Sequence, residues 1–321
     1  MKIKPIILVA GEPKSIFFEI FFKALKKKNY KSPLILICCK KLLLQRMKEH
    51  QFKKKLKILK INELKKINLD NKFINVIDIK LKSLPNKQNQ DKITKKYINE
   101  LFNTAFKLIK NGFTKKFING PINKKTFLNK KFLGVTEFVS KNFKIKKTGM
   151  LIYNKKLSVC PVTTHLPIKL VSKKITKKLI EEKIEILNLF FKKNFKIKPK
   201  IAVTGMNPHC ETVLNFNEDE KIVYSAIKTK RKKGINVKGP FPADTVFLKK
   251  NRNKFNVILG MYHDQVLAPF KTLFEYEAIN ITMGLPFFRV SPDHGPNQIM
   301  LGKNKSNPQS IIKALEFLDN K

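Results

Sequence analysis

Short apolar runs alternate with longer segments of helical periodicity along most of the chain. The first runs, KPIILVA (4–10) and PLILICC (33–39), are almost wholly apolar, as expected for strands buried on both faces. Each is followed by a segment with apolar residues at helical spacing, SIFFEIFFKALKKK (15–28) and KLLLQRMKEHQ (41–51). This alternation predicts an α/β sheet.

The same pattern continues to the C-terminal end. Long helices are expected near 93–111 and 173–194, and further strands in NVIDI (75–79), KFINGPI (116–122), GMLIYNKKLSVCPVTTH (149–165), KIAVTGMNPH (200–209), FNVILGMYH (255–263) and AINITMGLPFFRVS (278–291). In SNPQSIIKALEFL (306–318), Ser306 and Pro308 are predicted to be the N-cap and the first-turn proline of a final amphipathic helix.

Length and composition indicate a folded protein of one or two globular lobes. The chain has 321 residues, 42% of them hydrophobic, enough for one large core or two smaller ones. No apolar run is long enough to cross a bilayer, and MKIKPIILVAGEP is too short and ends in the wrong residues for a signal peptide. We therefore expect a cytoplasmic location. The four cysteines include no CxxC pair, which favours buried reduced thiols over disulfides or a zinc ribbon.

The net charge of +45 could indicate a nucleic-acid-binding surface, but the basic residues are not clustered. Lysines occur in every segment, and only Arg46, Arg231, Arg252 and Arg289 are arginines among the 68 basic residues. Readers of nucleic-acid sequence use arginine for bidentate contacts. A chain-wide drift toward lysine explains the composition better, so we expect no specific nucleic-acid partner and no membrane partner. In such a chain an arginine within a motif becomes informative.

Three of the five histidines follow predicted strands. His165 comes after SVCPVTT, His209 after IAVTGMNP and His263 after VILGMY. Ligands of open α/β sheets gather at the carboxyl ends of the strands, and three neutral imidazoles could converge there on one divalent cation. The spacing matches neither HExxH nor paired CxxC, so the spacing by itself favours unrelated surface or core histidines over a metal site. Asp264 and Glu211 could then be supporting partners, general bases or ordinary loop acids.

An ordered set of short motifs distinguishes these alternatives. The motifs span nearly the whole chain: GEP (11–13), GPINK (120–124), TEF (136–138), TTHLP (163–167), NPHCE (207–211), GPFPADTVF (239–247), YHDQ (262–265), NITMGLPF (280–287) and DHG (293–295). Together they resemble the 4-hydroxythreonine-4-phosphate dehydrogenase family of vitamin B6 biosynthesis.

The resemblance implies a two-lobed isocitrate/isopropylmalate dehydrogenase-like α/β fold rather than a Rossmann fold, and a homodimer with active sites at the subunit interface. In agreement, the chain contains neither GxGxxG nor a Walker A motif. The first lobe, on the NAD side, is expected to comprise residues 1–130 and 285–321. The second lobe, residues 131–284, is expected to carry the metal ligands and dimer contacts.

Residues that match the family's motifs are expected to have the roles that those positions have in the family. The metal ligands would be His165, His209 and His263, and the divalent metal zinc, magnesium or cobalt. Substrate contacts would come from Val135, Thr136, Lys271, Asn280 and Arg289, and NAD or NADP contacts from Asp293, His294 and Gly295. Asp264 and Asp244 are candidates for proton transfer or for supporting the ligands.

The implied reaction is NAD-dependent oxidation of the C3 hydroxyl of 4-phosphooxy-L-threonine with loss of the C1 carboxylate as CO2. The product would be 3-amino-2-oxopropyl phosphate, a precursor of pyridoxal phosphate. A substrate with phosphate, carboxylate and ammonium groups needs cations and directional donors, and Arg289 offers a planar fork that Lys271 lacks.

Two departures from the family pattern affect the substrate prediction. GEPKSIFFE replaces GEPAGIGPE, so Ser15, Phe17 and Phe18 are expected to change the bend of the first loop. Val135 stands where the family usually has a histidine in GHTEF.

Both departures leave open a relative acting on another phosphorylated hydroxy acid, such as D-erythronate 4-phosphate. A phosphotransacetylase-like enzyme is a further alternative, against which the histidine set argues, and an inactive basic binding protein would leave the metal site unexplained.

Overall fold

The computed structural model describes residues 3–82, 90–123, 127–128, 132, 134–213, 216–292 and 295–321. The chain divides into two compact units. Unit 1 consists of Met1–Phe132 with Pro286–Lys321, and unit 2 of Leu133–Leu285. Among the described residues, no helix is long and apolar enough to cross a membrane.

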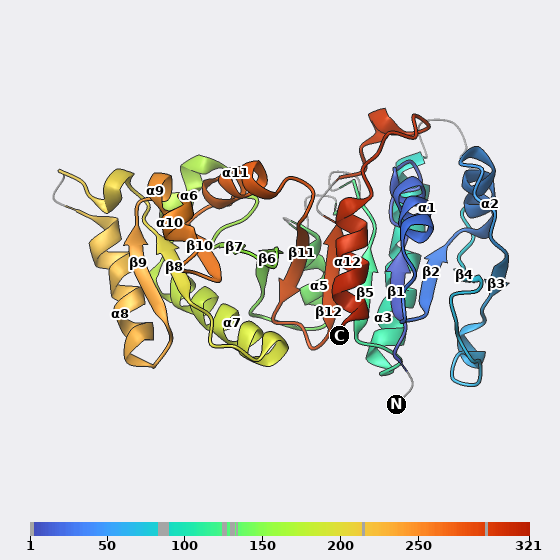
Figure 1. Cartoon of the computed structure of the whole chain (residues 1–321), viewed down its shortest axis with the longest axis horizontal. Coiled ribbons are helices and arrows are strands. Elements are labelled where there is room, and N and C mark those ends of the chain that lie inside the picture. Colours follow the sequence, from blue (N-terminus) through green and yellow to red (C-terminus); the bar gives the residue numbers. More distant parts are fainter. Residues whose placement is uncertain are drawn as a thin grey trace. The chain divides into compact units, whose positions relative to one another are not determined.

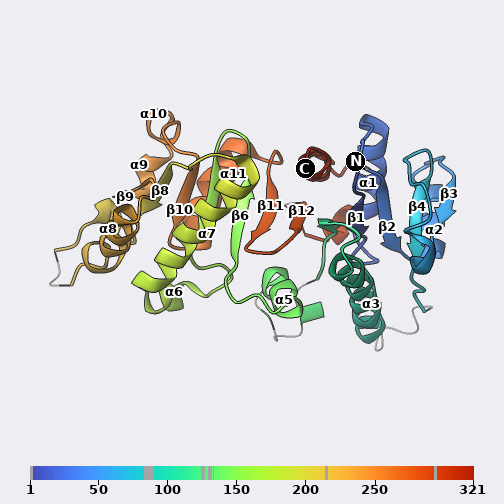
Figure 2. The same cartoon turned by 90° about the horizontal axis from the view of Figure 1, so that it is seen from below.

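Unit 1 is built on parallel strands. In chain order its elements are β1 (Ile6–Val9), α1 (Phe17–Lys27), β2 (Leu34–Cys38), α2 (Lys40–Glu49), β3 (Leu56–Ile58), β4 (Ile74–Asp78), α3 (Gln90–Lys110), β5 (Lys116–Asn119), β12 (Phe288–Pro292) and α12 (Gln309–Asp319). Its strands lie in the order β3-β4-β2-β1-β5-β12, and every pair is parallel. Helices α1 and α12 cover one face of this sheet and α3 the other (Figure 2). The first apolar runs of the sequence therefore become central strands with both faces covered.

Unit 2 carries a mixed sheet. Its elements are α5 (Val135–Asn142), β6 (Gly149–Tyr153), β7 (Ser158–Pro161), α6 (Ile168–Lys174), α7 (Lys177–Phe195), β8 (Ile201–Thr204), α8 (Ser225–Lys232), β9 (Val237–Phe241), α9 (Ala243–Val246), α10 (Lys249–Arg252), β10 (Val257–Gly260), α11 (His263–Phe274) and β11 (Ile279–Met283) (Figure 1). The strand order is β11-β6-β7-β10-β8-β9. Strands β7, β10, β8 and β9 are parallel, whereas β6 is antiparallel to both of its neighbours.

Alternation along β6 separates the two faces of the unit 2 sheet. Met150 and Ile152 pack in one cluster with Val266 and Phe270 of α11. On the other side, a Cβ atom at Gly149 would come within 3.7 Å of Ile186 on α7. Because successive strand residues point to opposite faces, α11 and α7 cover opposite faces of this sheet.

The first loop absorbs its unusual residues into the core of unit 1. Phe17 and Phe18 are 0% and 2% exposed, and their rings pack edge to face with centroids 5.6 Å apart. Ser15 donates to the Glu12 carbonyl at 2.7 Å and accepts from the Phe17 N–H at 3.4 Å. The serine side chain therefore satisfies the turn, and the two phenylalanines are core residues rather than part of the exposed loop.

The predicted start of the last helix is wrong. Helix α12 begins at Gln309 with Pro308 as its N-cap residue, and Asn307 Oδ1 accepts the Gln309 N–H at 2.8 Å. Ser306 instead contacts α1, where its N–H and hydroxyl donate to the Glu19 carboxylate at 2.7 and 3.0 Å. A buried acid 287 residues away in sequence thus determines the position of Ser306.

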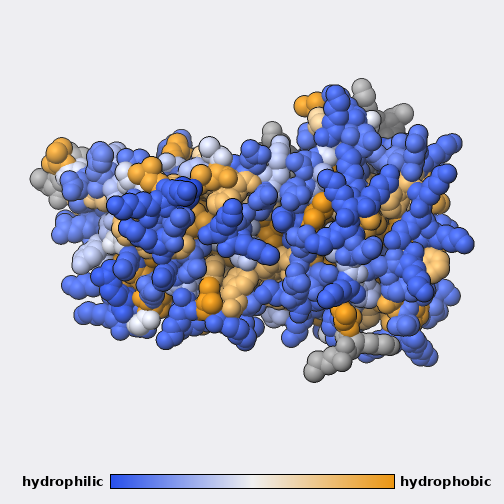
Figure 3. Space-filling model, viewed as in Figure 1, coloured by the Kyte–Doolittle hydropathy of each residue, from blue (hydrophilic) through white to orange (hydrophobic). Residues whose placement is uncertain are grey.

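Hydrophilic side chains cover most of the visible face (Figure 3). This agrees with lysines that are spread along the whole chain rather than gathered in one segment.

Candidate active site

The three predicted histidines lie at one edge of the unit 2 sheet. Strands β7, β8 and β10 are parallel, so their carboxyl ends share that edge. His165 follows β7 and His209 follows β8, while His263 is the first residue of α11 rather than a loop residue. Strand β9 ends at the same edge and is followed by Asp244 in the first turn of α9. The fold therefore brings four separate chain segments to one place.

Two of the imidazoles are already neighbours. The ring centroids of His165 and His263 lie 5.9 Å apart. His263 Nδ1 is 2.6 Å from Asp264 Oδ1, and the carboxylate favours a proton on Nδ1, which leaves Nε2 as a lone-pair donor. Asp264 is otherwise exposed, with 82% of its side-chain surface accessible.

The third imidazole sits on a tight turn. His209 has a φ of 57° and Cys210 a φ of 63°, a left-handed conformation that is uncommon for side-chain-bearing residues. Asp219, fully buried, holds this turn through the backbone N–H groups of Met206 and Asn207, at 2.6 and 2.9 Å. Within the described part of the chain, no three His, Cys, Asp or Glu side chains already lie together as a metal site. A contribution of His209 to a shared cation stays a prediction.

Acidic groups surround the His209 turn. Burial raises the pKa of the Cys210 thiol to about 11, and the nearby carboxylates of Asp219, Asp244 and Glu211 act in the same direction. Asp244 is itself exposed. Its charge therefore reaches the histidine turn, although its role in proton transfer stays a prediction.

Gln265 connects the histidine-bearing loops. Its Oε1 accepts from the Met261 N–H and from Thr204 Oγ1, both at 2.7 Å, and its Nε2 donates to the Gly205 carbonyl at 2.8 Å. Thr163 extends the connection, because its hydroxyl donates to the Met261 carbonyl at 2.8 Å. The loops after β7, β8 and β10 are thus joined by one network of buried and part-buried hydrogen bonds.

Two buried polar atoms of unit 2 have no hydrogen-bond partner among the described residues. They are the buried Glu137 Oε2 and Asn280 Oδ1. A Cβ atom at Gly134 would lie 2.9 Å from Glu137 Oε2 and 3.1 Å from His165 Cε1, so the glycine lets the carboxylate and the imidazole share one small space. Buried unpaired acceptors are costly unless a ligand or ion completes them, so this polar environment fits a site for a cation and a polar substrate.

The residues predicted to contact the substrate lie on different elements and differ in burial. Val135 and Thr136 are the first residues of α5, and Thr136 Oγ1 lies 3.3 Å from Thr282 Oγ1 on β11, the strand that also carries Asn280. Lys271 is exposed in the last turn of α11. Arg289 belongs to unit 1, is 3% exposed, and donates from Nε to Asn119 Oδ1 at 2.7 Å.

The predicted cofactor contacts are described only in part. Asp293 and His294 lie outside the described residues, while Gly295 follows them in unit 1. The parallel strands β1, β5 and β12 end at one edge of the unit 1 sheet, where the GEP motif and Gly120 also lie. The Glu12 N–H donates to the Pro121 carbonyl at 2.9 Å, and a Cβ atom at Gly120 would lie 2.2 Å from the Ala10 carbonyl oxygen. Gly120 is therefore required for the close approach of these two loops.

Sequence reasoning missed Gln265, Glu137, Thr163 and Asp219. The first three stand inside the motifs YHDQ, TEF and TTHLP. The motifs therefore indicated the right segments of the chain but not these particular residues. Asp219 lies outside every motif. Its one sequence signal was the rarity of acids, with 23 Asp and Glu against 68 Lys and Arg.

Comparison with known proteins identifies the family that this chain resembles in sequence. Residues 30–318 match the family model described as pyridoxal phosphate biosynthetic protein PdxA. The chain is 36% identical over 319 residues to the 4-hydroxythreonine-4-phosphate dehydrogenase of Sulfurihydrogenibium sp. (strain YO3AOP1), covering 97% of this chain and 96% of that protein. It is 31% identical over 324 residues to the D-threonate 4-phosphate dehydrogenase of Salmonella typhimurium, covering 99% and 98% of the two chains.

A solved structure agrees with these sequence matches. The 4-hydroxythreonine-4-phosphate dehydrogenase of Klebsiella pneumoniae superposes with a TM-score of 0.82 at 28% identity, covering 98% of each chain. The expected α/β fold class is thereby confirmed.

Proposed function

The chain belongs to the PdxA family of pyridoxal phosphate biosynthetic proteins, and we propose that it oxidises 4-phosphooxy-L-threonine with NAD and a divalent metal. The products are 3-amino-2-oxopropyl phosphate, CO2 and NADH. That the chain is an oxidoreductase of the 4-hydroxythreonine-4-phosphate dehydrogenase family follows from its relatives. The choice of NAD over NADP, the metal and a cytoplasmic location belong to the proposal.

One observation carries the metal-dependent part of the proposal: the imidazole centroids of His165 and His263 lie 5.9 Å apart at a sheet edge that the His209 turn also reaches. These three imidazoles would hold the cation. When bound, zinc, magnesium or cobalt would polarise the C3 hydroxyl and stabilise the negative charge that develops as CO2 leaves.

Side chains of unit 2 would orient the ligands and the substrate. Asp264 favours one tautomer of His263, and Glu137 lies close to His165 across the space beside Gly134. Asn280 Oδ1 is a buried acceptor without a partner in the described chain, which suits the ammonium or hydroxyl group of the substrate. Thr136 would donate to an anionic group and Lys271 would supply positive charge, while Arg289 of unit 1 stays a predicted substrate contact. Asp264 and Asp244 remain the candidates to accept the hydroxyl proton.

A direct assay tests the proposed reaction. Purified protein, NAD, 4-phosphooxy-L-threonine and each divalent metal in turn should yield NADH and trapped CO2 in equal amounts. NADP in place of NAD decides the cofactor. Absence of both products with every metal would overturn the proposal.

A second substrate has a specific observation in its favour. Val135 is an apolar residue at the start of α5, and a relative that matches 99% of this chain is named D-threonate 4-phosphate dehydrogenase. A phosphorylated hydroxy acid without the ammonium group, including D-erythronate 4-phosphate, is therefore the alternative. It should be assayed beside 4-phosphooxy-L-threonine, and the higher kcat/KM identifies the substrate.

We also propose a homodimer with the active site at the subunit interface, as expected for the family. Mixing a His209→Ala chain with an Arg289→Ala chain should restore some activity if the two residues serve one site from opposite subunits. Sedimentation as a monomer with full turnover would contradict this assembly.

A further inference from the structure

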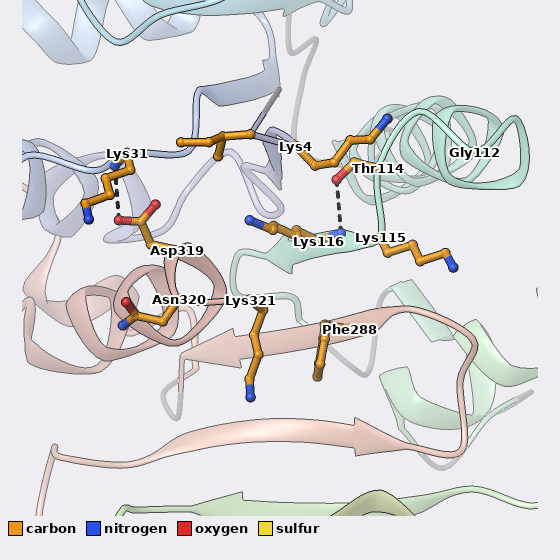
Figure 4. Close-up of a pocket in the computed structure, with 11 residues that line it drawn as sticks. Lys4, Lys31, Gly112, Thr114, Lys115, Lys116, Phe288, Asp319, Asn320 and Lys321 are labelled. Carbon is orange, nitrogen blue, oxygen red and sulfur yellow. Dashed lines mark hydrogen bonds between the residues drawn. The ribbon is translucent and has the colours of Figure 1, made fainter. Parts of the chain in front are cut away.

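A pocket lies in unit 1, at the edge of the sheet opposite to the loop that carries the GEP motif. It is a cavity of about 730 Å³ at the amino ends of β1, β5 and β12 (Figure 4). Five lysines and one acid contribute to its lining: Lys4, Lys31, Lys115, Lys116, Lys321 and Asp319. None of these residues belongs to the proposed active site, so the pocket needs a separate explanation.

Lys116 is the unusual member of this set. It is 7% exposed at the start of β5, and its Nζ donates to Ser32 Oγ at 3.0 Å. Among the described residues, the Lys116 Nζ has no other hydrogen-bond partner and no carboxylate within 4.0 Å. A buried ammonium with most of its N–H groups unsatisfied is unfavourable unless an anion pairs with it.

Asp319, the acid in the pocket lining, already accepts hydrogen bonds within the protein. Asp319 accepts the backbone N–H groups of Lys31 and Ser32, at 3.0 and 2.6 Å. Its charge acts to raise the pKa of Lys116, but burial has the larger effect and the net pKa is lowered. The lining therefore retains a strong excess of positive charge around a poorly solvated ammonium.

The character of the lining indicates which anion fits. No arginine lines the pocket, so there is no planar fork for a carboxylate. Lysines act as point charges that suit the oxygens of a dianion such as phosphate. Phe288 adds an apolar wall, and Lys321 Nζ lies 5.9 Å from the centroid of its ring. Figure 4 shows the Lys116 side chain extending from β5 toward Asp319, with Lys321 below it.

We propose that this cavity binds a small phosphate monoester, with Lys116 as the central contact and with Lys4, Lys115 and Lys321 supplying further positive charge. The phosphate would satisfy the Lys116 ammonium, and the organic part of the ester would pack against Phe288. This inference is independent of the proposed active site and of its metal.

Titration calorimetry tests the proposal on the full chain with phenyl phosphate and inorganic phosphate as probes. Lys116→Met should weaken phenyl phosphate binding at this site by roughly tenfold or more, because a charge-assisted contact is lost. Lys4→Met, at an exposed position, should weaken it less and cannot disturb the core. Lys107→Met on α3 removes an exposed charge away from the cavity and is the matched control. Equal effects of Lys116→Met and Lys107→Met would show general charge attraction and overturn the proposal.

The two probes distinguish the source of the phosphate. Phenyl phosphate should bind more tightly than inorganic phosphate, and Phe288→Ala should remove that difference. Equal affinities in the unmodified chain would overturn the monoester assignment in favour of free phosphate.

Amine labelling gives a second, residue-specific measurement. The lowered pKa of Lys116 leaves more neutral amine than an exposed lysine has at pH near 9, so acylation followed by mass spectrometry should detect this residue. Phenyl phosphate should protect Lys116 and leave Lys107 labelled. Unchanged labelling of Lys116 under saturating phenyl phosphate would contradict the proposed contact even if the methionine variant fails to fold.

Discussion

Thr204 at the end of β8 donates its hydroxyl hydrogen bond to Gln265 on α11, at 2.7 Å. Through this contact and those to Met261 and Gly205, one amide side chain holds together the turns that lead to His209 and His263. Positioning of the candidate metal ligands therefore depends on a residue that is neither charged nor a ligand.

Replacing Gln265 should loosen both turns. Gln265→Met keeps the volume but leaves three polar groups without their partner, which should lower the free energy of unfolding by about 2 to 4 kcal/mol. Metal affinity should fall about tenfold to hundredfold, as for other residues that orient ligands. Urea unfolding and metal titration measure the two effects. The control is Gln45→Met at an exposed position of α2, expected to change stability by less than about 0.5 kcal/mol. Unchanged metal affinity in folded Gln265→Met would refute the positioning role.

Asp219 should stabilise the His209 turn. Asp219→Asn replaces one of two accepting oxygens by an NH2 group that faces a backbone N–H, so the free energy of unfolding should fall by about 1.5 to 3 kcal/mol. Denaturant unfolding measures this loss. Asp70→Asn is the control, since exposed Asp70 accepts one backbone N–H from Lys72 at 2.9 Å and should have a much smaller effect. Equal losses in the two variants would mean that the buried carboxylate has no special role.

Metal binding should depend on His209 and not on His50. His209→Ala removes one of three proposed imidazole ligands and should lower metal content and activity together. His50 is the C-cap residue of α2, and its ring packs against Phe22 with centroids 6.0 Å apart, so His50→Ala should leave both properties nearly unchanged. Metal analysis of the purified proteins and steady-state assays provide the comparison. Full activity of metal-stripped protein would disprove the ligand assignment.

Glu12 should make stability depend on pH in the acidic range. Burial raises the pKa of this carboxyl above its usual value of 4.5. Between 4.5 and the higher native pKa the folded state binds more protons than the unfolded state, so Glu12 contributes stability at low pH that is lost as pH rises. Glu12→Gln should therefore gain stability relative to the wild type between pH 4 and neutrality. Parallel urea unfolding series at these pH values test the sign, and a gain that shrinks with rising pH would contradict it.

Val135 should limit substrate affinity if a histidine is suited to its position. Val135→His adds a hydrogen bond worth about 0.5 to 3 kcal/mol, so KM for 4-phosphooxy-L-threonine should fall by roughly several-fold to tenfold or more. KM for NAD should stay nearly constant, because the new contact is made to the other substrate. Steady-state kinetics on folded, metal-loaded protein measure both constants. An unchanged or higher KM for the phosphorylated amino acid would favour the alternative hydroxy-acid substrate.

The sequence alone determined the strands at the centre of each unit. Ile6–Val9, Leu34–Cys38 and Val257–Gly260 are short apolar runs between polar segments, and all are fully buried parallel strands. The pattern is local, and burial on both faces of a parallel sheet requires little more than continuous apolar residues. The sequence did not indicate β9, because Gly239 and Pro240 within it and Pro242 after it are typical of turns.

The alternation of strands and loops in the sequence also determined which histidines follow strand ends. Their spacing could not show that His165 and His263 approach to 5.9 Å between ring centroids, because that distance depends on how β7 and β10 pair. It could not show the left-handed backbone at His209, which Asp219 supports from a helix beyond the turn. Nor could it separate Gln265 from its neighbour Asp264: the side chain of Asp264 is exposed, whereas that of Gln265 reaches into the network between β8 and β10. Side-chain direction at a helix start is decided by the packing of α11 on the sheet, and only the tertiary structure provides that packing.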